Sequence, residues 1–201
     1  MKKKVFFTLI IVVVMVMTLT ACQLIGGKDV YTELNTMARM EYNTINMEVQ
    51  TTYQGVTLVN KYSALLGANG TIVTYSVESL ATIDPEVGMP ENMIETKTGS
   101  ATIRDGKIVS QTGDDVTIPT SMSALAIHFD EAYFDTPKTY AEGSLHVFDA
   151  KVKDVKGFTG SNTFEGKDMR VCVRYNEKLD TVVIDYTSEN GAGVKVIYKF
   201  R

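Results

Sequence analysis

The sequence contains no tryptophan and only two histidines among its 201 residues. A metal centre needs several nitrogen, sulfur or oxygen ligands, so His128 and His146 alone argue against a histidine-based metal site. The chain also lacks a G-x-S-x-G nucleophile elbow, a P-loop and a G-x-G-x-x-G dinucleotide motif. Its adjacent acids at 114–115 and 130–131 lack the every-second-residue spacing of a calcium loop. We therefore expect no metal, no cofactor and no enzyme activity.

Positive charge is scarce once the N-terminal segment is set aside. The chain has 20 basic and 24 acidic residues, and three of the basic residues but none of the acidic ones lie in residues 1–21. The remainder carries 17 minus 24, which is −7. This negative net charge argues against nucleic acid as a partner and against a polybasic membrane-binding patch.

The N-terminal segment is an apolar run that follows positive charge and precedes small residues. Lysines at positions 2–4 come before an apolar stretch over 5–17, and the residues directly before Cys22 are Leu19, Thr20 and Ala21. This pattern resembles the signal peptide of bacterial lipoproteins, in which a branched apolar residue and two small residues precede a cysteine. The resemblance implies that residues 1–21 are removed and that Cys22 becomes the acylated first residue of the mature chain.

Two other interpretations of this segment remain open. One is an uncleaved membrane helix, because no charge appears over 5–27 and about 20 apolar residues span a bilayer. The other is an ordinary secretory signal that releases a soluble protein. Lipidation requires a cysteine at this position, whereas the membrane-helix and secretory-signal interpretations do not. All three place the remaining chain outside the cytoplasm, because the lysine cluster stays on the cytoplasmic side.

The lipoprotein resemblance implies a location and a domain layout. We expect an anchor on the outer face of a bacterial cell membrane, or an outer membrane in a two-membrane cell because Gln23 and not Asp follows the cysteine. Residues 22–28 would form the lipidated cysteine and a short tether, and 29–201 one domain of ordinary size. With Cys22 acylated only Cys172 remains, so no intramolecular disulfide can form.

Hydrophobic periodicity predicts a helix followed mostly by strands. Asp29 can cap a helix over 30–42, after which the period changes from 3.6 to 2. The alternation predicts strands at 45–53, 56–66, 71–83, 93–104, 107–111, 144–153, 168–175, 180–187 and 193–200. A second helix is predicted over 120–129, and an aromatic-rich loop or short turn of helix over 130–140.

About nine strands joined mainly by hairpins predict an α+β fold with a curved, mostly antiparallel sheet and two helices that cover one face. The element order resembles that of LolA-like lipoprotein carriers and related mycobacterial-type lipid-binding lipoproteins: a helix, a meander, the Asp105-Gly106 hairpin, a helical insert, and strands that end in VRYNEKLDTVVIDYTSENGAGVKVIYKF. The resemblance implies an open half-barrel closed by helices over an apolar cavity. Such carriers often contain tryptophan, which this chain lacks, and Cys22 fits lipid-anchored relatives better than the soluble carrier.

Two functions follow from this interpretation. The first is a membrane-anchored envelope protein that binds a lipid, an acyl chain or a lipoprotein in an apolar cavity. The second is an anchored module with a filled core that recognises another envelope protein or a cell-wall component. Methionine and aromatic side chains suit adaptable apolar walls, although the same side chains can simply fill a core. The pocket candidates are Met47, Tyr75, Met122, Leu125, Phe129 and Phe134.

Overall fold

The computed structural model describes most of the chain after the N-terminal segment. The described residues are 29–67, 70–80, 82–83, 94–105, 107–115, 118, 127–161 and 166–201. The predicted signal peptide, its cleavage residues Leu19, Thr20 and Ala21, the lipidation site Cys22 and the tether lie outside this range.

Strands make up most of the described chain. One long helix, α2 (Val30–Ala38), precedes β1 (Thr44–Tyr53), β2 (Val56–Gly67), β3 (Gly70–Leu80), β4 (Thr82–Ile83), β5 (Ile94–Arg104) and β6 (Lys107–Gly113). The 3-10 helix η3 (Glu131–Tyr133) then leads to β7 (Phe134–Glu142), β8 (Leu145–Val152), α3 (Val155–Thr159), β9 (Gly166–Tyr175), β10 (Leu179–Ser188) and β11 (Gly193–Phe200).

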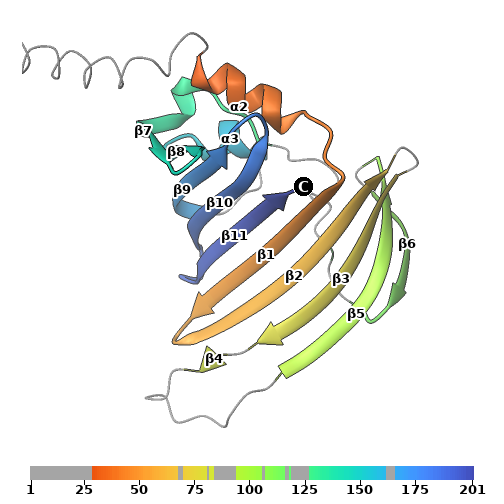
Figure 1. Cartoon of the computed structure of the whole chain (residues 1–201). Helices are drawn as coiled ribbons and strands as arrows, with labels where there is room; N and C mark the ends of the chain where they lie inside the picture. Colours follow the sequence, from red (N-terminus) through yellow and green to blue (C-terminus); the bar gives the residue numbers. More distant parts are fainter. Residues whose placement is uncertain are drawn as a thin grey trace, which may run out of the picture.

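These strands form one open antiparallel sheet. The strand order across the described sheet is β6-β5-β3-β2-β1-β11-β10-β9-β8-β7, and β4 pairs with β2 beside this path. Ten strands therefore follow one another where the sequence predicted about nine, because 134–142 adds a strand. The predicted strand 71–83 divides into β3 and β4, and β4 is the eleventh strand of the described sheet. Figure 1 shows that the sheet is curved and that β1 lies beside β11, so the last strand pairs with the first.

The sheet has one apolar and one polar face, as the period-2 alternation requires. The apolar face carries buried side chains on nearly every strand, among them Ile45, Met47, Tyr62, Ala64, Val73, Phe148, Val171, Val173, Val182 and Phe200. Most of their neighbours along the strands, such as Asn46 and Glu48, point to the polar face and are half-buried or exposed, whereas Val147 on β8 is buried. Burial of the apolar face on folding is the main stabilising contribution, about 25 cal/mol for each Å² of apolar area removed from water.

Helix α2 packs on the apolar face beside β8 to β10 (Figure 1). Asp29 caps it as predicted, because its carboxylate accepts the backbone N–H of Tyr31 at 3.2 Å, and Leu34 and Met37 are buried beneath it. The helix ends at Ala38, earlier than the predicted residue 42. Tyr42 turns into the core instead: its hydroxyl donates to the Met37 carbonyl at 2.9 Å and accepts the Leu179 N–H at 3.1 Å.

Three predicted segments differ from the structure. Residues 134–142 form strand β7 and not a loop, although η3 supplies the predicted short turn of helix before it. Residues 127–129, the end of the predicted second helix, are not helical, and 119–126 lie outside the described residues. The second described helix is α3, which lies between the predicted strands 144–153 and 168–175, where no helix was predicted.

Candidate binding site

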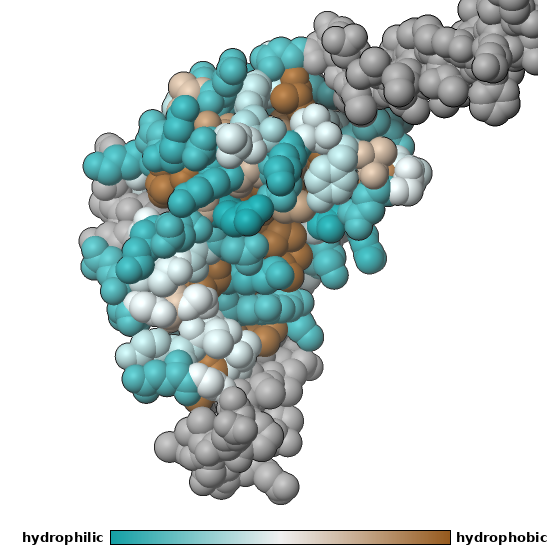
Figure 2. All heavy atoms as spheres, turned by 90° about the vertical axis from the view of Figure 1, so that its left-hand side faces the viewer, coloured by the Kyte–Doolittle hydropathy of each residue, from teal (hydrophilic) through white to brown (hydrophobic). Residues whose placement is uncertain are grey.

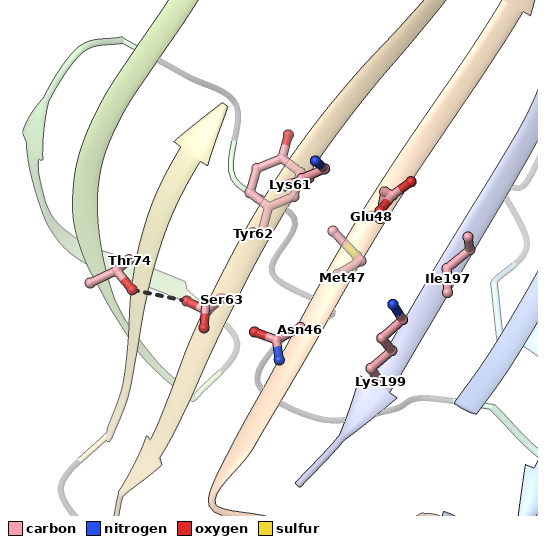
Figure 3. Close-up of a pocket in the computed structure, with 9 residues that line it drawn as sticks. All are labelled: Asn46, Met47, Glu48, Lys61, Tyr62, Ser63, Thr74, Ile197 and Lys199. Carbon is pink, nitrogen blue, oxygen red and sulfur yellow. Dashed lines mark hydrogen bonds between the residues drawn. The ribbon is translucent and has the colours of Figure 1, made fainter. Parts of the chain in front are cut away.

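The described chain contains an open depression of about 400 Å³ on the polar face of the sheet. Figure 3 shows that its side chains come from β1, β2, β3 and β11. Strand register brings them together, because Asn46 lies opposite Ser63 on β2 and Lys199 on β11, and Ser63 lies opposite Thr74 on β3. The full lining is Asn46, Met47, Glu48, Lys61, Tyr62, Ser63, Thr74, Ile197 and Lys199.

The depression offers hydrogen-bonding groups of both kinds. The Gln50 amide donates to the Glu48 carboxylate at 2.6 Å, and the Thr74 hydroxyl donates to the Ser63 carbonyl at 3.4 Å. Lys199 makes no ion pair with another residue of the described part, and its ammonium borders the depression. The arrangement can therefore hold a polar ligand or a polar segment of another protein, and it holds no reactive constellation of nucleophile and base.

Elsewhere on the polar face, two arginines are paired with carboxylates. The Arg170 guanidinium contacts both carboxylate oxygens of Asp149 at 3.2 Å, and Arg174 donates to Glu142 at 2.8 Å. These pairs are partly exposed, so each contributes little to stability, typically about 0–1 kcal/mol. Hydrophilic residues cover most of the side of the molecule that β7 borders (Figure 2).

Two of the predicted pocket residues, Phe129 and Phe134, lie in a tightly packed aromatic cluster. Their ring centroids are 6.0 Å apart, and both rings contact Phe148 and Phe158 edge to face. Tyr31 of α2 stacks on Phe134 at 6.0 Å. Phe129 and Phe134 are buried, so in this region the predicted pocket residues fill the core between α2, α3 and β8.

The other pocket candidates are distributed differently. Met47 is buried on the apolar face and also borders the depression from within the sheet. Tyr75 pairs with Tyr62 through the backbone of β3, and its side chain lies outside the described atoms. Met122 and Leu125 lie in the undescribed segment 119–126. Among the three candidates whose side chains are described, Met47, Phe129 and Phe134, the structure brings together Phe129 and Phe134.

The apolar face continues beyond the core toward the β1–β2 turn. Strand register places Tyr186, Val194, Thr51 and Leu58 side by side on four neighbouring strands. Leu58 is 43 % exposed and Tyr53, near the same turn, is 47 % exposed. We call this region the apolar end patch. Sequence reasoning missed it, although the alternation over 45–53 already placed Tyr53 on the apolar side.

The residues that sequence analysis weighed for chemistry are dispersed. His128 is exposed, and His146 lies 5.5 Å from the Tyr175 ring, with its buried Nδ1 lacking a hydrogen-bond partner in the described structure. Cys172 is half-buried on the polar face, where burial raises the pKa of its thiol and the Arg174 guanidinium lowers it by less. A raised pKa keeps the thiol protonated and unreactive at neutral pH.

Over the described ranges, no group of three His, Cys, Asp or Glu side chains has the arrangement of a metal site. The helices of that part of the chain are too short and too polar to cross a membrane. The sequence matches no protein-family model and no curated protein.

Proposed function

We propose that this chain is a membrane-anchored envelope lipoprotein without catalytic activity, held by acylated Cys22 on the outer face of a bacterial membrane. Leu19, Thr20 and Ala21 supply the small-residue cleavage sequence that the anchor requires. Two or three acyl chains hold firmly, since each buried methylene adds about 0.8 kcal/mol of membrane affinity. The described part of the chain begins at Asp29, and in this proposal residues 22–28 are the tether between it and the bilayer.

The bound cargo in this proposal is a lipid, an acyl chain or a lipoprotein, carried by the sheet in the manner of an open half-barrel. The apolar end patch is the observation that supports it. Leu58 and Tyr53 continue the apolar face past the region that α2 and the aromatic cluster cover, and they remain exposed. An acyl chain laid along this row would remove both side chains from water, which is favourable in proportion to the apolar area buried.

Native mass spectrometry of the protein purified from membranes tests the cargo. We expect a co-purifying lipid in the unaltered protein and its loss in Leu58→Glu, because a carboxylate on the apolar face cannot be desolvated cheaply. Tyr140→Glu is the matched control, since Tyr140 is also exposed but lies on β7, away from the apolar end patch. Absence of lipid from the unaltered protein, together with a core that has no continuous apolar cavity of about 300 Å³, would overturn lipid carriage.

A second function has its own supporting observation. The aromatic cluster around Phe148 is filled, and the described depression lies on the polar face and not the apolar one. These features suit an anchored module that recognises another envelope protein or a cell-wall component through polar contacts. The mass spectrometry above separates the two functions, because a module of this kind retains no lipid.

The anchor has a separate test. Cys22→Ser should abolish acyl labelling and move the protein from the membrane fraction to unprocessed or soluble forms, because serine cannot form the thioether to diacylglycerol. Labelling with a radioactive or alkyne-bearing fatty acid measures this directly. Unchanged labelling in Cys22→Ser would refute acylation at this residue, and native protein that retains residues 1–21 would favour the uncleaved membrane helix.

A further inference from the structure

Exposed apolar side chains concentrate at one end of the sheet. We call this end the upper rim: it is where β1, β3 and β6 begin and β2 and β5 end (Figure 1). Eight large apolar side chains are exposed among the described residues, and five of them belong to the upper rim: Met40, Leu65, Ile72, Ile108 and Val109. The other three are Tyr53 and Leu58 of the apolar end patch and Tyr140 on β7.

Strand register makes the upper rim continuous. Leu65 lies opposite Ile72, and Ile72 lies opposite Thr102, which in turn pairs with Ser110 beside Val109. Neighbouring strands are about 4.8 Å apart, so the row from Leu65 to Val109 extends over roughly 15 Å. Leu65 is 57 % and Val109 56 % exposed, more than any other large apolar side chain described.

The upper rim also gathers positive charge in a chain that is otherwise acidic. Arg39 ends α2, Arg104 and Lys107 are opposite each other across the β5–β6 turn, and the Arg201 carbonyl accepts the N–H groups of residues 43 and 44 at 2.9 Å. Against these four cations stand Glu41 and Asp105, and the neighbouring β9–β10 turn adds Lys178, Glu177 and Asp180 beside the end of β11. Residues 22–201 together carry −7, so the rim has the opposite sign from the whole.

The proposed anchor joins the N-terminal end of α2, where Tyr31 contacts Phe134 and Phe148, and the other end of this helix adjoins the upper rim. Helix α2 has nine residues and is about 14 Å long, and its last turn adjoins Met40 of the upper rim. Residues 22–28 number seven and reach at most about 25 Å when extended. A bilayer that holds Cys22 is therefore within reach of the whole rim, and Figure 1 shows α2 and the upper strand ends on the same side of the molecule.

We infer that the upper rim is a second membrane contact, which rests on the bilayer surface and binds anionic lipid headgroups. This inference depends on the proposed anchoring at Cys22. The anchor keeps the rim at the interface, where its apolar side chains enter the headgroup region and its cations meet negative phosphates. The contact fixes the orientation of the domain, so that the apolar end patch points away from the anchoring membrane.

Fluorescence quenching by lipid tests this contact in the full-length mature protein, reconstituted into vesicles of phosphatidylcholine and phosphatidylglycerol. An environment-sensitive dye is attached at Leu65→Cys in a Cys172→Ala background, and brominated lipid serves as the quencher. We expect blue-shifted emission and loss of most of its intensity at this position. Dyes at Tyr53→Cys and Tyr140→Cys are the controls, because both residues are exposed but lie away from the rim. Equal quenching at all three positions, or none at Leu65→Cys, would overturn the inference.

The charge component has its own comparison. Arg39→Gln with Lys107→Gln should weaken quenching at Leu65→Cys in vesicles that contain phosphatidylglycerol, and added salt should weaken it further. Lys195→Gln is the matched control, because Lys195 is an exposed cation on β11, next to Gln50 and distant from the rim. Quenching that is identical in pure phosphatidylcholine and unaffected by the rim substitutions would refute a role for anionic headgroups.

The two proposals fail in different ways. If the acylated protein floats with vesicles while the dye at Leu65→Cys is not quenched, the anchoring proposal is supported and the rim contact is refuted. If the purified protein carries no acyl group, as its intact mass would reveal, the anchor itself is wrong.

Discussion

Phe148 is a fully buried member of the aromatic cluster that contacts three other elements. Its side chain is completely buried, and its ring lies 5.3 Å from Phe134, 5.8 Å from Tyr31 and 6.0 Å from Phe129. Each of these contacts is edge to face, the arrangement that aromatic quadrupoles favour. Three elements, α2, the segment before η3, and β7, therefore depend on one side chain of β8.

We predict that Phe148→Ala lowers the free energy of unfolding by about 3–5 kcal/mol, because it removes a large buried ring and leaves a cavity. Urea denaturation of the full-length protein, followed by circular dichroism, measures the loss. Tyr140→Ala is the control, since Tyr140 is 45 % exposed and its replacement should change stability by no more than about 0.5 kcal/mol. Similar losses for both variants would contradict a packed cluster.

Single residues also explain where sequence reasoning placed an element boundary wrongly. The helical spacing of positions 30, 34, 37, 38 and 41 extended the predicted first helix to residue 42. In the structure Tyr42 is buried against Phe200, with ring centroids 4.8 Å apart, and its hydroxyl bridges α2 and β10. A tertiary contact 137 residues away in sequence decided this boundary, and no local pattern contains it.

At the scale of elements, one amide side chain of α2 links the helix to the 127–130 segment. Asn35 donates to the Phe129 carbonyl at 2.6 Å and accepts the Phe129 N–H at 2.9 Å. These two hydrogen bonds satisfy the backbone N–H and carbonyl of Phe129, which belongs to no strand or helix. Because unsatisfied buried backbone groups are costly, Asn35 fixes the position of the 127–130 segment against the helix.

We predict that Asn35→Ala destabilises the protein by about 1–3 kcal/mol, the usual cost of leaving buried polar groups without partners. Hydrogen exchange should accelerate at the Phe129 amide more than at amides of β10. Glu41→Ala, at an exposed position after the helix, should leave both stability and exchange unchanged. Unaltered exchange at Phe129 in Asn35→Ala would contradict the proposed link.

The elements that sequence analysis missed have recognisable physical causes. Pro137 and the positive φ of Thr136 interrupt β7 with a register shift, so its alternation is lost although its pairing with β8 continues. Helix α3 contains Gly157, a poor helix former, at a point where a Cβ atom would collide with the Tyr133 ring. In both segments local preference was overridden by packing, whereas strands with regular alternation, such as β1 and β11, were predicted almost to the residue.

The whole molecule contains several buried tyrosines whose ionisation opposes folding. Burial is the main cause that raises the pKa of Tyr31, Tyr42, Tyr62, Tyr175 and Tyr186. An unfolded tyrosine ionises near pH 10, whereas the folded ones keep their protons to higher pH. The stabilising contribution of these protonated tyrosines is therefore fully present below about pH 10, and it is lost as the pH rises through their raised pKa values.

We predict that these tyrosines leave the urea midpoint unchanged from about pH 7 to pH 9. Above about pH 10 their ionisation should lower the midpoint. Tyrosinate absorbance should rise together with the loss of circular dichroism. Tyr62→Phe should reduce the steepness of this fall, while Tyr53→Phe should not, because Tyr53 is exposed. An alkaline midpoint that is insensitive to Tyr62→Phe would contradict a contribution from its burial.

The distribution of charge shows how a whole-molecule property can conceal a local one. The net charge of −7 over residues 22–201 argued against a polybasic patch, and no run of basic residues exists in that part of the sequence. The fold nevertheless brings Arg39, Arg104, Lys107 and Arg201 to one end of the sheet. The same folding places Leu65 and Ile72 opposite each other at that end.

The sequence by itself determined the antiparallel sheet, most of its strands and the capped first helix, because these depend on periodicity and turn residues within short segments. It also supplied the lipoprotein-like N-terminus, on which the anchoring proposal depends. The tertiary structure alone decided that Phe129 and Phe134 fill a cluster, that the depression lies on the polar face, and that exposed apolar and basic residues share one rim. Those arrangements depend on which strands become neighbours, and neighbours such as β1 and β11 lie too far apart in the chain for any local pattern to specify them.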